Sequence, residues 1–116
     1  MGAIRGAICA KNTVEDISDK SLRLVREIVA RNGINTEDIE AIFFSATKDL
    51  DACYPAKSVR EQLQLNNVAF MCFSEMNVAN SLSHCIRVCV FVKDLVQSDC
   101  KHCYLGEAAN LRADLK

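Results

Sequence analysis

Arg87 is the charged residue whose surroundings in the sequence most need an explanation. It lies in the segment Cys85–Val92, in which all the remaining residues are apolar. Because side chains alternate between the two faces of a strand, we expect its guanidinium to lie among apolar neighbours on either face. A buried guanidinium needs an anion. That anion is either a structural carboxylate, Glu75 or Glu107, or a ligand's carboxylate or developing oxyanion, which the guanidinium fork suits.

Three further cations could join Arg87 at such a site. Arg5 lies beside Gly6 in an apolar stretch near the start of the chain, and Lys57 and Arg60 are three residues apart in a helical pattern. A solvated helix face is the commoner explanation for that spacing, and Arg5 could sit at an exposed strand end. Together, however, these residues predict a site that gathers positive charge around a small anion.

The overall charge and the missing motifs narrow the function. Fourteen Lys plus Arg and fifteen Asp plus Glu leave a net charge of −1, so no global field favours nucleic acid or an anionic membrane. The sequence has no glycine-rich phosphate loop, no Gly-x-Ser-x-Gly elbow and no His-Glu-x-x-His pair. Cys100 and Cys103 flank His102, but a tetrahedral metal site needs more ligands. We therefore expect no metal.

The chain has 116 residues, half of them apolar, which predicts one domain spanning residues 1–116. Its seven cysteines are an odd number, and no apolar segment behind a basic start is typical of a signal peptide. The longest strongly apolar stretch, Val88 to Val92, is far shorter than the roughly twenty residues of a membrane-spanning helix. We expect a cytoplasmic protein with reduced thiols.

Apolar periodicity predicts an order of strands and helices that could position these cations. The clearest helix begins after Thr13, which stands three residues before Asp16 as in a capping box, and ends at Gly33. Pro55 is suited to the first turn of a second, short helix. Strands are predicted at residues 3–10, 39–46, 68–73, 85–92 and, more weakly, 102–111, with a loop at 47–54 and a polar connection at 74–83. This order predicts an α+β domain with helices on one face of a mixed sheet, whose edges favour oligomerisation.

Several separated blocks carry most of the charged and polar candidates. They are Ile4-Arg5-Gly6-Ala7, Asn12-Thr13 with Glu15, Ser45-Ala46-Thr47-Lys48-Asp49-Leu50, Tyr54-Pro55-Ala56-Lys57 with Val59-Arg60-Glu61, Cys72 with Glu75-Met76, Cys85-Ile86-Arg87-Val88, His102 with Tyr104-Leu105, and Leu111-Arg112 with Asp114-Leu115. In this order and with nearly constant spacing, the blocks resemble the single-domain chorismate mutases of the Bacillus type. The resemblance runs from Ile4 to Leu115.

The resemblance implies the rearrangement of chorismate to prephenate, a step of the shikimate pathway toward phenylalanine and tyrosine. This reaction is a unimolecular shift within a dianion, so it needs no nucleophile, no cofactor and no obligatory proton transfer. It needs the reactive conformer held in place and the charge on the breaking ether bond neutralised. The resemblance also implies a homotrimer whose sheets pack into a pseudo-barrel core, with clefts between subunits.

The same resemblance implies a role for each site residue. Arg87 would donate to the ether oxygen and hold a carboxylate, while Glu75 and Cys72 would contact the ring hydroxyl. The other implied residues are Arg5 and Tyr104 on a substrate carboxylate, Lys57, Arg60 and Arg112 as positive potential at the mouth, and Tyr54, Ala56, Met71 and Leu111 as walls.

Two other functions are compatible with a carboxylate-binding arginine. The first is a small trimeric imine or enamine hydrolase, which would have to place a water molecule on an imine carbon. The second is a non-catalytic module in which the arginines clamp a carboxylate and the cysteine-rich strands form the core. Turnover of chorismate, hydrolysis of an imine, and binding without turnover distinguish the three.

Overall fold

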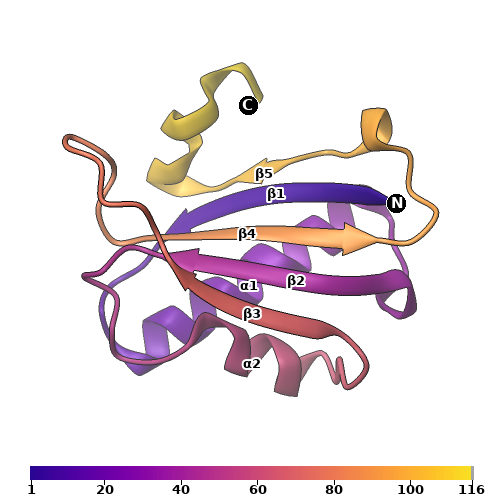
Figure 1. The fold of residues 1–116 in the computed structure, drawn as a ribbon, viewed down its shortest axis with the longest axis horizontal. Helices are drawn as coiled ribbons and strands as arrows, with labels where there is room; N and C mark the ends of the chain where they lie inside the picture. Colours follow the sequence, from indigo (N-terminus) through magenta and orange to yellow (C-terminus); the bar gives the residue numbers. More distant parts are fainter. Residues whose placement is uncertain (116) are drawn as a thin grey trace.

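One mixed sheet of five strands, in the order β3-β2-β4-β1-β5, carries two helices on one of its faces (Figure 1). The computed structural model describes the backbone of residues 1–115 and the side chains of residues 1–111. The strands are β1 (Gly2–Cys9), β2 (Ile39–Ala46), β3 (Ala69–Ser74), β4 (Cys85–Val92) and β5 (Cys103–Tyr104), the helices are α1 (Val14–Asn32) and α2 (Pro55–Gln62), and 3₁₀ segments lie at Thr36–Asp38, Gln97–Asp99 and Gly106–Leu115. The predicted fold class is confirmed.

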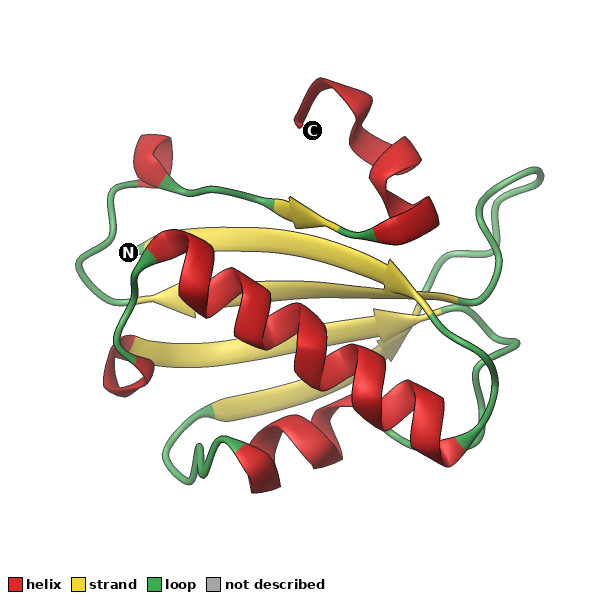
Figure 2. Ribbon diagram, turned by 180° about the vertical axis from the view of Figure 1, so that it is seen from behind, coloured by secondary structure: helices red, strands yellow, loops and turns green. Residues whose placement is uncertain are grey.

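Helix α1 begins and ends where its capping residues predict. The Thr13 hydroxyl accepts a hydrogen bond from the Asp16 N–H at 3.1 Å, and Gly33 ends the helix with a left-handed φ of 55°. The helix crosses the sheet diagonally (Figure 2) and buries one stripe of side chains against it. That stripe consists of Ile17, Ser21, Leu24, Val25 and Ile28. Burial of this stripe, more than helix propensity, stabilises α1 on the sheet.

Strand β4 is the centre of the sheet and pairs antiparallel with β1 on one side and β2 on the other. Helix α2 is the crossover between the parallel strands β2 and β3. The residues of β4 alternate between the two faces, and Ile86, Val88 and Val90 are buried on the face that the helices cover.

The opposite face of the sheet, which we call the open face, carries neither α1 nor α2. Arg87 lies on it with 44 % of its side chain exposed. The prediction of a guanidinium buried among apolar neighbours is therefore wrong for the single chain, because only one face of this sheet is covered. In the rows across the sheet, Arg87 lies between Ser45 of β2 and Ala7 of β1 rather than between large apolar side chains.

The predicted strand at residues 102–111 is also wrong over most of its length. Only Cys103–Tyr104 pair with β1, and Gly106, at a φ of 57°, turns the chain out of the extended conformation into the 3₁₀ segment Gly106–Leu115. Ala108 of that segment is fully buried in a small cluster with Ala7 and Cys85. Burial on the open face, rather than strand pairing, therefore holds this part of the chain.

Among the residues that the structure describes, no helix is long and apolar enough to cross a bilayer.

Gly6 lies where β1 closely approaches both β5 and α1. A Cβ atom at residue 6 would lie 2.7 Å from the Cys103 carbonyl oxygen and 3.1 Å from Cδ1 of both Leu24 and Ile28. We expect Gly6→Ala to lower the free energy of unfolding by about 1–3 kcal/mol through overpacking. Denaturant unfolding measures this change. Gly33→Asn is the matched control, because residue 33 faces open space and Asn tolerates its positive φ. An unchanged midpoint for Gly6→Ala would contradict this account of the packing.

Candidate active site

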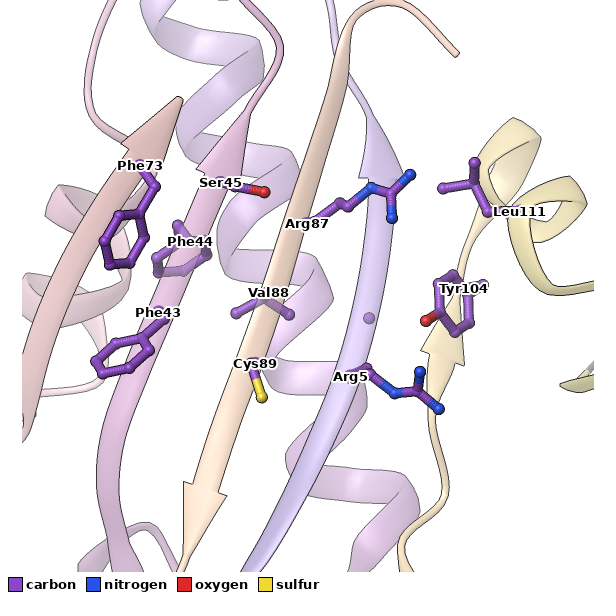
Figure 3. Close-up of a pocket in the computed structure, with 11 residues that line it drawn as sticks. Arg5, Phe43, Phe44, Ser45, Phe73, Arg87, Val88, Cys89, Tyr104 and Leu111 are labelled. Carbon is purple, nitrogen blue, oxygen red and sulfur yellow. The ribbon is translucent and has the colours of Figure 1, made fainter. Parts of the chain in front are cut away.

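Residues from all five strands and the 3₁₀ segment Gly106–Leu115 surround a hollow of about 440 Å³ on the open face (Figure 3). We call it the arginine pocket. The register explains why its cations meet, because Ala7 of β1 pairs with both Arg87 and Tyr104, and Arg5 lies two residues from Ala7 on the same face. The polar and apolar side chains that line it include Arg5, Ser45, Phe73, Arg87, Tyr104 and Leu111.

Glu75 partly neutralises the charge at one end of the arginine pocket. Its Oε2 lies 3.6 Å from Nε of Arg87 and accepts a hydrogen bond from the hydroxyl of Ser45. Of the two structural carboxylates considered as partners for Arg87, Glu75 is therefore the one that lies beside it. With side-chain exposures of 44 % and 24 %, the two groups remain accessible from solvent, so a ligand can reach the guanidinium.

Arg5 carries the second guanidinium of the pocket on an exposed position of β1. Its backbone N–H donates to Nδ1 of His102 at 2.9 Å, which ties β1 to the segment that leads into β5. In Figure 3, the guanidinium of Arg5 and the phenol of Tyr104 lie on the same side of the pocket. Two guanidiniums and a phenol can together hold a small molecule with two carboxylates.

A second group of predicted residues surrounds the start of α2. Tyr54 and Cys72 line another hollow, of about 570 Å³, between the loop after β2 and the end of β3. Burial raises the pKa of the Cys72 thiol, and a hydrogen bond to the Ala56 backbone N–H offsets this only in part. Cys72 is therefore a neutral thiol near pH 7, suited to a weak polar contact and not to nucleophilic attack. We call Tyr54, Ala56, Lys57, Arg60 and Cys72 the helix group.

The structure brings the predicted residues together as two groups and not as one site. The helix group lies at the β3 edge of the sheet, whereas Arg5 of β1 lies three strand spacings away, about 14 Å at about 4.8 Å per strand. In addition, Cys72 packs against the core on the covered face, whereas Arg87 lies on the open face. Met71, half exposed on the open face, lies outside both hollows, and the side chain of Arg112 lies outside the described residues.

Sequence reasoning missed seven residues that line the arginine pocket, and four of them add a polar or aromatic side chain on the open face. Ser45 adds a hydroxyl, Cys89 a thiol, and Phe43 and Phe73 an edge-to-face aromatic pair with ring centroids 5.8 Å apart. The signal that could have found three of them is alternation within the predicted strands. Ser45 is two residues from Phe43, and Cys89 is two residues from Arg87, so each pair shares a face.

The turn that precedes β4 is tied to the loop after β2 by one carboxylate. Asp49 accepts the backbone N–H of His84 at 3.1 Å on each of its oxygens, and its Oδ2 lies 3.3 Å from the His84 imidazole. The Thr47 hydroxyl also donates to Asp49. Partial burial opposes ionisation of Asp49, but these hydrogen bonds and the charge of a protonated His84 together lower its pKa. Asp49 thus holds the left-handed backbone of His84, where φ is 51°.

In the part of the chain that the structure describes, no group of three or more His, Cys, Asp or Glu side chains lies close enough together to hold a metal ion. The chemistry that the arginine pocket offers is electrostatic. Fixed positive charges and a phenol can bind carboxylates and stabilise negative charge that develops on an oxygen.

Comparisons with known proteins agree on one family. The sequence matches the family described as chorismate mutase type I over residues 1–115. It is 40 % identical to "Chorismate mutase AroH" of Bacillus subtilis over 114 residues, which cover 97 % of this chain and 90 % of that protein. It is 35 % identical to the protein of the same name from Thermus thermophilus, with 97 % and 94 % covered. The solved chorismate mutase from Clostridium thermocellum superposes with a TM-score of 0.89 at 38 % identity, covering 95 % of this chain and 99 % of that one.

We expect the Asp49 network to stabilise the fold only while its carboxylate is ionised. Because the folded-state pKa is lowered, its contribution is complete above the unfolded pKa of about 4 and is lost as pH falls through the lower folded value. Asp49→Asn should therefore lower the Tm at pH 7, and the gap to the parent should close below about pH 4. Thermal unfolding followed by circular dichroism tests this, with exposed Asp19→Asn as the control. A gap that is constant with pH would contradict it.

Proposed function

The chain belongs to the chorismate mutase type I family, and we propose that its arginine pocket is the place where it rearranges chorismate to prephenate. As a chorismate mutase it is an isomerase. The observation that carries the assignment of the site is the convergence of Arg5, Arg87 and Tyr104 on one hollow of about 440 Å³. Its charge suits a dianionic substrate, and the reaction requires no group beyond those present in the chain.

In the proposed mechanism the chain's residues act by position and charge. Breakage of the ether C–O bond and formation of the new C–C bond occur within one molecule, and no proton moves. Arg87 donates to the ether oxygen, on which negative charge grows in the transition state, so its interaction is stronger there than with bound chorismate. Arg5 and Tyr104 fix a carboxylate and thereby hold the reactive conformer. Glu75 accepts from the ring hydroxyl.

The helix group completes the site from a neighbouring subunit in this proposal. Cys72 contacts the ring hydroxyl and Tyr54 and Ala56 form walls with Met71 and Leu111, while Lys57, Arg60 and Arg112 add positive potential at the mouth. The separation of the two groups within one chain supports this arrangement, because Arg5 lies about 14 Å from the β3 edge and Cys72 packs on the face opposite Arg87. We therefore propose that residues 1–116 form one domain and that clefts form between subunits of a homotrimer.

The open face supports the proposed assembly. It exposes Met71 and Phe73 by 52 % and 48 %, and Phe43 stacks edge-to-face between Phe73 and Phe91. A contiguous apolar patch of this kind is typical of a protein interface. Cover from neighbouring subunits would also exclude water from Arg87 and strengthen its interaction with the developing oxyanion.

A cytoplasmic location is part of the proposal. All seven cysteines are free thiols, among them the buried Cys85 and Cys103. Burial raises the pKa of Cys85 to about 11, so this thiol is inert at neutral pH. Reduced thiols are typical of a reducing compartment, where the biosynthetic substrate would also be found.

Loss of the Arg87 guanidinium should remove most of the catalysis. We expect Arg87→Ala to cost at least about 3 kcal/mol of transition-state stabilisation, a loss in kcat/KM of more than about 100-fold, by analogy with the removal of one oxyanion donor. Chorismate consumption and prephenate formation by purified protein provide the measurement. Arg26→Ala, on the exposed side of α1, is the matched control. A kcat/KM for Arg87→Ala within a few-fold of the parent would refute this role.

Complementation between two defective subunits tests the shared cleft. Arg87→Ala disables the arginine pocket and Arg60→Ala disables the helix group, so each variant alone should be impaired. In trimers assembled from equal amounts of both, about one quarter of the clefts would combine an intact half from each partner, and activity should recover toward that fraction. Sizing should give about three times 12.9 kDa. Mixed assemblies no more active than the separate variants would contradict clefts between subunits.

A further inference from the structure

Ser45 occupies a special position beside the principal cation of the pocket. It lies near the end of β2, directly opposite Arg87 in the antiparallel register of β2 and β4. On its other side it pairs with Phe73 of β3, so Ser45 lies between Phe73 and Arg87 in the row across the sheet. Figure 3 shows the Arg87 guanidinium extending over β1 toward Leu111, away from Ser45. The register therefore does not bring the Ser45 hydroxyl onto the guanidinium of Arg87.

The hydroxyl of Ser45 instead donates to Glu75. The acceptor is Oε2, the same oxygen that faces Nε of Arg87 at 3.6 Å. The backbone of Glu75 is held as well, because its N–H donates to the carbonyl oxygen of Ala46 at 3.0 Å. Both the backbone and the carboxylate of Glu75 are therefore attached to the end of β2.

The distance between Oε2 of Glu75 and Nε of Arg87 is longer than that of a tight ion pair. A charge-assisted N–H···O bond is ordinarily about 2.7–2.9 Å long, and the pair here is clearly looser. Without another donor, the carboxylate would gain by moving onto the guanidinium, and a tight ion pair would compete with the substrate for Arg87. A hydroxyl donor on Oε2 satisfies that oxygen and holds it back from the guanidinium.

We propose that Ser45 is a positioning residue for the rearrangement, which holds the Glu75 carboxylate beside Arg87 without letting it close on the guanidinium. This inference rests on the proposed function, in which Arg87 serves the ether oxygen and Glu75 the ring hydroxyl. Ser45 touches neither the reacting atoms nor, in this assignment, the substrate. Its effect is transmitted through Glu75.

The experiment is a double-mutant cycle on the full-length protein, with chorismate as substrate. Ser45→Ala should lower kcat/KM by about tenfold, as expected for one hydrogen bond to a charged group, with most of the loss in kcat. Ser45→Thr retains a hydroxyl and should stay within about threefold of the parent. In a Glu75→Ala background, Ser45→Ala should change kcat/KM by less than about twofold, because the group it positions is gone. A Tm for each variant, compared at one protein concentration, checks folding and assembly.

Each other result overturns the inference. An equal loss from Ser45→Ala with and without Glu75 would mean that Ser45 acts by packing. Ser45→Ala at the parent's activity, while Glu75→Ala is impaired, would mean that Glu75 needs no positioning, and would leave the proposed function intact. Parental activity of Glu75→Ala would remove Glu75, and Ser45 with it, from the mechanism. A parent protein that does not convert chorismate would overturn the proposed function itself.

Discussion

The candidate site depends on one constraint, the fixed position of the Arg87 guanidinium on the uncovered face of the sheet. Strand β4 is central and apolar, and its buried side chains fix its register with β1 and β2 to single residues. That register places Arg87 between Ser45 and Ala7 and brings Arg5 and Tyr104 to the same hollow. A guanidinium held this way can act on a developing oxyanion because its position, rather than a chemical reaction of its own, is its contribution.

The availability of Arg87 to a ligand depends on where the Glu75 carboxylate is held. A carboxylate next to an arginine can neutralise it, and in this protein the two are close enough to interact but too far apart for a tight ion pair. The backbone of Glu75 is bonded to Ala46, and Asp49 ties the following turn to the loop after β2. Several modest hydrogen bonds around the ends of β2 and β4 therefore keep an acidic group near a cation while leaving the cation available.

The order of the strands divides the site residues into two groups. Because β4 inserts between β1 and β2, the residues that precede α2 and those of β1 lie toward opposite edges of one sheet. The helix group and the arginine pocket therefore lie apart in the single chain, and Met71 and Phe73 of β3 are exposed on the open face. The same feature accounts for an open pocket in the isolated chain and for the assembly proposed above.

Local chemistry was readable directly from the sequence. The Thr13 cap, the Gly33 stop and the apolar runs at 39–46 and 85–92 determine their elements because capping, left-handed φ and side-chain alternation act over a few residues. The sequence also identified Arg87 as a cation needing an anion.

Only the tertiary structure decided which face of β4 is covered, that residues after Gly106 bury Ala108 without forming a strand, and that Ser45 shares Glu75 with Arg87. These outcomes depend on contacts between residues far apart in the chain, and no local pattern contains the free energy of such contacts.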